Sequence, residues 1–208
     1  MFEKKRDFIE HFFWPGDFNK ITKKTWSHLM FESNWSFGRI FRKMPMDKHL
    51  YTFGPGANFE IHLYRPEYKE ALLQLLKLNT PKYFAESEKA DYNNYLDHEV
   101  ESYFVIKHKS GILGAGGINY FEHERLARIS WDIVHPEWQG TGIGRHLVSY
   151  RMEVLSKRTD LHKVVVRTSQ LTYEFYEKMG FELEMIQEHY WAPDLHLYQM
   201  SMEPRGRS

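Results

Sequence analysis

The sequence predicts an α+β domain, with a mixed, mostly antiparallel sheet of six to seven strands flanked by helices and an aromatic-rich N-terminal extension. From about residue 59 to 203, apolar runs typical of strands alternate with runs of helical spacing. Around a glycine-rich stretch, a strand, a helix and a strand follow one another, which favours a parallel crossover. The remaining strands are joined mostly by short turns, which favours antiparallel neighbours.

The first half of this region predicts one strand, two helices and a hairpin. The run FEIHLY (59–64) is expected to be a strand, and Pro66 is expected to open a helix. The spacing of Leu72, Leu75, Leu76 and Asn79 is helical. Ser87 is a candidate cap for a second helix over 88–100. Two apolar runs within 102–121 then predict a hairpin.

The second half predicts a strand over 126–134, a helix, a short buried strand over 162–169 and a short helix. The first of these helices carries an apolar stripe formed by Ile143, Leu147, Val154 and Leu155. Gly180 is expected to end the short helix. Two final apolar runs within 182–202 predict a closing hairpin.

The composition excludes several classes of protein. The 208 residues carry 28 basic and 28 acidic side chains, whereas a nonspecific nucleic-acid binder is expected to be basic. No apolar run is long enough for a membrane span, and the N-terminus does not resemble a signal peptide, so we expect a cytoplasmic protein. The absence of cysteine excludes disulfides and thiolate sites, and the twelve histidines show no spacing typical of a metal site.

Residues 1–57 are assigned to an extension of unknown role, and residues 58–204 to the folded domain. The Gly-Pro-Gly of FGPGAN is typical of a linker at this boundary. The extension holds Trp14, Trp26 and Trp35, and so many aromatic residues argue against disorder. We expect them to be buried, against the acceptor cleft or against a second subunit in a homodimer. Met44 and Met46 lie near the boundary, so a later start of translation is an alternative.

The stretch VHPEWQGTGIGRHL places Gly140, Gly142 and Gly144 at alternate positions between a strand and a helix. It is not a P-loop, because Gly144 is not followed by Lys and Ser or Thr, and a dinucleotide fingerprint would need glycine at Arg145. Free amides at a helix start favour an anion, and glycines allow its close approach. The alternative is a tight turn that packs against a neighbouring element.

Two motifs resemble those of the GNAT superfamily of N-acetyltransferases. Residues 139–144 fit the pattern Q/R-x-x-G-x-G/A, and FYEKMGF (175–181) is similar to a second signature of the family. The expected order of elements over 59–203 matches as well. The resemblance implies a GNAT-like sheet and an acyltransferase that uses acetyl-CoA as co-substrate, without a metal.

The resemblance also implies where acetyl-CoA would bind. The backbone of Ile133 and Val134 would pair with the pantetheine arm and polarise the acetyl carbonyl, where the family splays two strands at a bulge. Ser169 stands where many members carry an asparagine, and its shorter side chain puts that contact in question. The pyrophosphate would be held by Gln139, Gly140, Thr141, Gly142, Ile143, Gly144 and Arg145.

Tyr176 matches the family's tyrosine, which acts as general acid to the CoA sulfur and lies beside the cofactor. A phenol is a neutral proton donor at pH 7, which suits this role. The alternative is a packed aromatic side chain, because Leu171, Phe175 and Met179 surround it at helical spacing.

The general base is left open by the sequence. Asp132 interrupts an otherwise apolar strand, so it is either a catalytic group or one half of a salt bridge, with Arg128 or Arg167 as expected partner. The charged residues Glu122, His123 and Glu124 are alternatives that would act through water. Val164 stands where the ribosomal-protein alanine acetyltransferases carry a glutamate, so that form of base is absent.

These inferences predict an N-acetyltransferase that passes the acetyl group of acetyl-CoA directly to a primary amine of a small molecule or of a protein or peptide. The ending EHYWAPDLHLYQM (188–200) resembles the closing hairpin of members that acetylate protein N-termini. One alternative is a non-catalytic, acyl-CoA-binding regulatory module of the same fold. Another is an interaction protein that works through the extension. No nucleic-acid or membrane partner is expected.

Overall fold

The computed structural model describes residues 49–53 and 57–204, which lie within one compact unit, Lys48–Ser208. The predictions about the tryptophans of the extension and about Met44 and Met46 fall outside these residues. Among the described residues, no helix has the length and apolar character needed to span a membrane.

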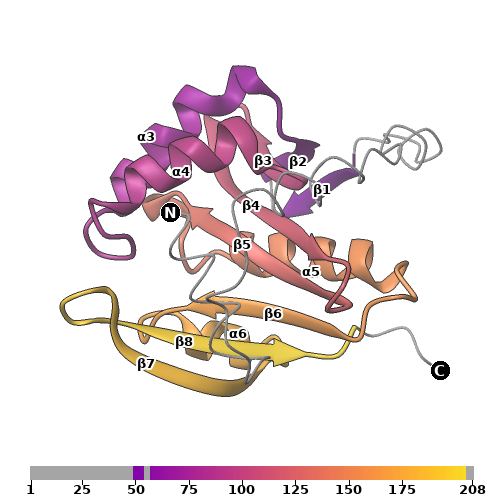
Figure 1. The fold of residues 1–208 in the computed structure, drawn as a ribbon. Helices are drawn as coiled ribbons and strands as arrows, with labels where there is room; N and C mark the ends of the chain where they lie inside the picture. The colour runs from indigo at the N-terminus through magenta and orange to yellow at the C-terminus, as the bar shows by residue number, and fades with distance from the viewer. Residues whose placement is uncertain (1–48, 54–56, 205–208) are drawn as a thin grey trace, which may run out of the picture. The chain divides into compact units, whose positions relative to one another are not determined.

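Eight strands form one sheet in the order β1-β2-β3-β4-β5-β6-β8-β7 (Figure 1). The strands are β1 (His49–Phe53), β2 (Ala57–Leu63), β3 (Ser102–His108), β4 (Gly111–Phe121), β5 (Leu126–Val134), β6 (Lys163–Thr168), β7 (Glu182–Ala192) and β8 (Leu195–Met202). The helices are α3 (Lys69–Asn79), α4 (Glu88–His98), α5 (Ile143–Ser156) and α6 (Tyr173–Glu177), with short 3-10 turns at Pro66–Tyr68 and Pro136–Trp138.

The predicted fold class is confirmed. β5 and β6 are parallel and are joined through α5, while the other neighbouring strands are antiparallel. Strands β2–β8 are the seven that the sequence pattern predicts. β1 adds an eighth by pairing with β2, from His49 opposite Ile61 to Phe53 opposite Ala57. This strand lies before residue 58, where the sequence places the start of the domain.

The sheet buries one apolar cluster on each face. On one face, α5 and α6 contribute Leu147 and Tyr176 to a cluster that includes Ile129 of β5. On the other face, α3 and α4 contribute Leu72 and Tyr92 to a cluster that includes Ile133 of the same strand (Figure 1). Strand β5 therefore contributes side chains to both layers, and it positions residues of the site on both faces of the sheet.

Of the two helix ends predicted from the sequence, the one at Gly180 is confirmed and the cap at Ser87 is wrong. Gly180 has φ +95°, and the N–H of Phe181 reaches back to the carbonyl of Tyr176, so Gly180 ends the last helical turn as predicted. The cap expected from Ser87 is wrong, because its side chain makes no capping hydrogen bond. Instead, the carboxylate of Glu88 accepts a hydrogen bond from the N–H of Ala85 at 2.8 Å.

Candidate active site

The glycine stretch forms the turn from β5 into α5. Gly140 and Gly142 have φ of +76° and +98°, a region that side chains with a Cβ rarely adopt. The first hydrogen bond back into the helix runs from His146 N to the carbonyl of Gly142. The N–H groups of residues 143–145 therefore have no partner within the helix, which is where an anion would be held.

Beside this turn, the parallel strands β5 and β6 separate. Their pairing ends at Ile129 and Val166, although β5 continues to Val134 and β6 to Thr168. The N–H of His135 bonds to Leu113 of β4 at 2.8 Å, so the peptide groups of Val134 point away from β4. An extended ligand could add there as a strand, as the resemblance implies.

A bulge in β5 lies within the separated part. Gly117 pairs with Ser130 and Ala115 with Ile133, so Trp131 and Asp132 together face the single residue Gly116. Trp131 has φ +52°, which is unusual for a bulky residue. The extra residue shifts the alternation of side chains. Trp131 packs against the cluster under α3 and α4, and Asp132 points to the opposite face, toward α5 and α6.

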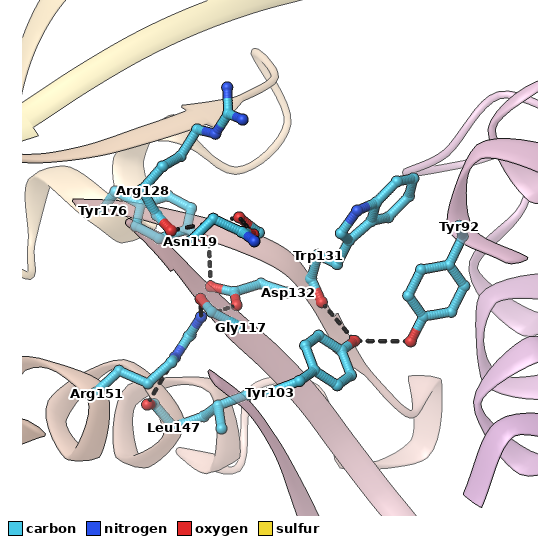
Figure 2. A network of polar contacts seen from close by, with 11 residues as sticks. Tyr92, Tyr103, Gly117, Asn119, Arg128, Trp131, Asp132, Leu147, Arg151 and Tyr176 are labelled. Carbon is cyan, nitrogen blue, oxygen red and sulfur yellow. Dashed lines mark hydrogen bonds and ion pairs between the residues drawn. The ribbon is translucent and has the colours of Figure 1, made fainter. Parts of the chain in front are cut away.

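Asp132 meets the two helices of that face through two side chains (Figure 2). The hydroxyl of Tyr176 in α6 donates a hydrogen bond of 2.5 Å to its Oδ2. Nη1 of Arg151 in α5 forms an ion pair of 2.5 Å with its Oδ1. Burial and the neighbouring carboxylate raise the pKa of Tyr176 well above its ordinary value. Tyr176 therefore keeps its proton at neutral pH, as a proton donor must.

Arg151 is fully buried and anchors the carboxylate. Its Nε donates to the carbonyl of Leu147 at 3.1 Å and its Nη1 to the carbonyl of Gly117 at 3.0 Å. Burial lowers the pKa of Arg151, but the adjacent Asp132 more than offsets this, and the net shift is upward. A buried arginine stays charged at low cost only when such partners surround it.

Two glycines of β4 make room for these side chains on opposite faces. A Cβ on Gly116 would overlap Oδ1 of Asp132 and lie 2.7 Å from Nη1 of Arg151. A Cβ on Gly117 would lie 2.5 Å from the hydroxyl of Tyr95 and 2.7 Å from the ring of Tyr103. Glycine at positions 116 and 117 of β4 is therefore required by the packing of charged and aromatic side chains against the sheet.

The end of β5 is tied to α3 by amide side chains. The carbonyl of Val134 accepts hydrogen bonds from Asn79 and from Gln139, each at 3.2 Å. Gln139 also donates to Asn79 at 2.9 Å and accepts from the hydroxyl of Tyr83 at 3.3 Å. Because the carbonyl of Val134 is engaged, its N–H is the group that remains to face a ligand.

The comparisons with known proteins agree with this geometry. Residues 99–183, from the end of α4 to the start of β7, match the family described as acetyltransferase (GNAT) domain. This segment is a GNAT domain. Among curated protein sequences, none matches the chain.

Solved structures show the same GNAT fold at low sequence identity. The ribosomal-protein-S18-alanine N-acetyltransferase of Escherichia coli has a TM-score of 0.60 and 17% identity, with 72% of this chain and 96% of that chain covered. An aminoglycoside 6'-N-acetyltransferase complexed with coenzyme A has a TM-score of 0.59 and 16% identity, covering 71% and 98%. The spermidine N-acetyltransferase of Vibrio cholerae, in complex with CoA and spermine, has a TM-score of 0.56 and 17% identity, covering 70% and 95%.

Within the GNAT domain, most residues predicted to contact acetyl-CoA lie together at the start of α5. Arg145 is exposed there, Ile143 is buried beneath the turn, and Thr141 bonds to the carbonyl of Trp138 at 2.6 Å. Ser169 lies in the turn before α6, where its hydroxyl accepts from the N–H of Leu171 at 3.3 Å. That bond gives Ser169 a local role in the turn.

Other predictions about the base are corrected by the fold. Asp132 forms its salt bridge with Arg151 and not with Arg128 or Arg167, the two partners expected from the sequence. Ile129 and Val166 face α5 and α6, so their neighbours Arg128 and Arg167 lie on the opposite face of the sheet. The bulge turns Asp132 toward α5 and α6, away from both arginines.

The charged loop before β5 does not join the site either. Glu122, His123 and Glu124 are exposed in the turn between β4 and β5, at the opposite end of β5 from Asp132. Glu122 pairs there with Arg158 at 3.3 Å. Val164 is fully buried in the apolar cluster.

Three residues of the site were missed by sequence analysis, although each leaves a signal. Arg151 follows Leu147 by four positions and precedes Leu155 by four, so a charge occupies the buried stripe of α5. Asn79 similarly ends the apolar stripe of α3 and is buried. Gly116 gives only a weak signal, as a glycine inside a strand that can mark a close approach.

Proposed function

We propose that the protein is an N-acetyltransferase that transfers the acetyl group of acetyl-CoA directly to a primary amine. The observation that supports this most strongly is the contact between Tyr176 and Asp132, from elements 44 residues apart. A module that only binds acyl-CoA needs the glycine turn and the open strand edge. It gives no reason for a proton donor and a carboxylate to meet beside them.

Binding of acetyl-CoA follows from the two features next to this pair. The pyrophosphate binds the free amides at the start of α5, with the exposed Arg145 as a charge partner. The pantetheine arm lies along the separated edge of β5, where the N–H of Val134 receives it, while Ile133 pairs with Ala115 of β4. The thioester then lies next to the bulge and within reach of Tyr176.

The reaction has a simple balance of bonds and protons. The amine nitrogen attacks the acetyl carbonyl carbon, a C–N bond forms and the C–S bond breaks. The amine loses one proton and the CoA sulfur gains one, which gives an amide and free CoA. Tyr176 supplies the proton to sulfur as general acid.

Asp132 completes the proton transfer as the proposed base. Its side chain is 19% exposed, whereas Tyr176 is 5% exposed, so the carboxylate is the member of the pair that faces incoming groups. Arg151 occupies Oδ1, which leaves Oδ2 to take the amine proton and pass it along the hydrogen bond to Tyr176. The raised pKa of Tyr176 makes a lasting phenolate unfavourable, so the phenol gives up its proton as Asp132 returns one.

The acceptor is an amine of a small molecule or of a peptide. Two of the similar structures act on different kinds of amine by their names, a ribosomal-protein alanine and spermidine. The closing hairpin of β7 and β8 supports the peptide class by its resemblance to protein N-terminal acetylating members. The apolar Val164, buried in the core, argues against it because those members place a glutamate there.

The test is release of free CoA thiol from acetyl-CoA, with a panel of polyamines, aminoglycosides and peptides with free N-termini. Calorimetry with CoA runs in parallel on the same preparation. Thiol release that depends on one amine, with the acetylated amine found by mass spectrometry, supports the proposal. Tight CoA binding without turnover on the whole panel contradicts it and favours the regulatory module.

A further inference from the structure

The position of Asp132 depends on the bulge in β5. Ile129 belongs to the cluster under α5 and α6, so regular alternation would place residue 132 on the opposite face, under α3 and α4. The observed strand instead places Trp131 and Ile133 under α3 and α4. Only because of the extra residue does Asp132 reach Tyr176 and Arg151. Without the bulge, the proton donor and its carboxylate would lie on different sides of the sheet.

The bulge is a strained conformation that must be held in place. Trp131 has φ +52°, and a bulky residue adopts this region only where its surroundings over-determine it. On one side, the indole ring packs 4.8 Å from the ring of Tyr92 and stacks at 6.1 Å on Phe84. These contacts fix the side chain, and the main chain requires a separate anchor.

That anchor is a chain of two buried hydroxyl groups (Figure 2). The hydroxyl of Tyr103 donates to the carbonyl of Trp131 at 3.0 Å. Because Tyr103 has one hydroxyl proton, the 2.7 Å bond between Tyr92 and Tyr103 must be donated by Tyr92. Burial raises the pKa of both tyrosines, so both remain neutral donors. Tyr92 therefore donates to Tyr103, and Tyr103 donates to the carbonyl of Trp131 in the bulge.

We infer that Tyr103 is a positioning residue of the acetyltransferase site, which locks the β5 bulge through the carbonyl of Trp131 and thereby holds Asp132 against Tyr176. This inference rests on the function proposed above. The same bond fixes the peptide group between Trp131 and Asp132, at the edge of β5 where the proposed function places the acetyl group. Tyr103 contacts neither substrate and acts only through the strand.

Tyr95 provides a matched control in the same cluster. Its ring lies 5.5 Å from that of Tyr103 and 6.0 Å from that of Trp131, and the residue is 3% exposed. Among the described residues, its buried hydroxyl has no hydrogen-bond partner. Tyr95→Phe and Tyr103→Phe therefore delete the same group from the same environment, and only the second deletion releases the bulge.

The experiment compares the two variants of the full chain by steady-state kinetics. Tyr103→Phe is expected to lower kcat about ten- to a hundredfold, the cost of a small misplacement of catalytic groups, with KM for acetyl-CoA little changed. Tyr95→Phe is expected to leave kcat and KM as in the wild type. Tyr92→Phe, which removes only the outer donor, is expected to act in the same direction as Tyr103→Phe and more weakly.

A double-mutant cycle tests whether Tyr103 acts through Asp132. In an Asp132→Asn background, Tyr103→Phe is expected to have little further effect on kcat, because the position of a side chain that no longer accepts a proton matters less. A purely structural role predicts independent, multiplicative losses instead. Multiplicative losses, or equal kcat values in Tyr95→Phe and Tyr103→Phe, would overturn the inference.

Amide hydrogen exchange provides a readout that does not need turnover. Exchange in residues 130–134 is expected to be faster in Tyr103→Phe than in the wild type, and unchanged in Tyr95→Phe. Unchanged exchange in both variants would overturn the inference even if the enzyme is active. If exchange is faster in Tyr103→Phe but the wild type turns over no amine, the proposed function is contradicted, while the role of Tyr103 in holding the bulge is supported.

Discussion

The hydroxyl of Tyr176 donates a 2.5 Å hydrogen bond to Oδ2 of Asp132, which joins the last turn of α6 to the bulge of β5. This bond connects the motif FYEKMGF, which contains Tyr176, with β5, the strand that leads to the glycine turn. Packing alone would not require it, because a phenylalanine fills the same space. The bond is therefore the part of the site that function explains best.

The first prediction follows directly from that bond. Tyr176→Phe keeps the ring and removes only the proton donor, so kcat is expected to fall on the order of 10²–10⁴-fold while CoA affinity stays close to that of the wild type. Residual turnover is expected, because the thiolate can take a proton from water. Steady-state kinetics and calorimetry with CoA measure the two effects separately.

Tyr173→Phe on the same helix is the matched control, since Tyr173 packs against Tyr198 at 4.8 Å and not against Asp132. It is expected to leave kcat unchanged. Full kcat in Tyr176→Phe would show that the acid is another group and that the second motif only packs the helix.

The pH dependence of the rate offers a second prediction. The pKa of Tyr176 is raised well above its ordinary value of 10 by burial and by Asp132. The protonated phenol is the active form, so its loss can lower kcat only as the pH rises through that higher pKa. We expect no fall in kcat from Tyr176 between pH 7 and 10, measured with a saturating amine. A fall in that range that disappears in Tyr176→Phe would contradict the raised pKa.

Much of the fold could be predicted because its signals are local. The alternation in 126–134 and the apolar stripe of α5 each report on a few neighbouring residues, and the glycines at 140 and 142 occupy the positive φ that only glycine adopts easily. The order of such elements then restricts the sheet to few topologies. Strand β1 was missed because it precedes a Gly-Pro-Gly sequence that is equally typical of a linker.

The details of the site could not be predicted because they depend on the bulge. Regular alternation would assign Asp132 to the face of Arg128, whereas its partner Arg151 lies on the opposite face. One extra residue reverses this assignment, and nothing in ISWDIV itself marks where the register shifts. The glycine opposite, Gly116, becomes informative only when the pairing of β4 and β5 is known.

A third prediction concerns the buried ion pair. Arg151→Met leaves the carboxylate of Asp132 without its counter-ion and is expected to lower the free energy of unfolding by about 3–5 kcal/mol. Adding Asp132→Asn removes that charge, so the double variant is expected to recover most of the loss. Urea unfolding of the two single variants and the double variant measures the coupling. Additive losses would show that the two side chains do not stabilise each other.

The glycine turn gives a fourth prediction. Gly142→Val places a branched side chain at φ +98°, where the pyrophosphate is expected to approach, and should weaken CoA binding at least about tenfold, or 1.4 kcal/mol. Gly144→Ala is the control, because its added Cβ would make an ordinary contact of 3.5 Å with the ring of Phe175. It is expected to keep CoA affinity. Calorimetry on folded Gly142→Val that gives wild-type affinity would show that CoA does not use this turn.

The last prediction separates the extension from the sheet. A chain that starts at Met46 keeps β1, and we expect it to keep the fold and the CoA affinity of the full chain, since the GNAT match and the glycine turn lie far downstream. A chain that starts at Asn58 loses β1 and exposes the backbone edge of β2. Its Tm is expected to be lower than that of the chain from Met46, by about 2–4 °C for each kcal/mol that β1 contributes. Thermal unfolding and CoA calorimetry of both chains test this. If the chain from Met46 lost both solubility and CoA binding, residues 1–45 would belong to the core of the domain, and the boundary would have to move to the N-terminus.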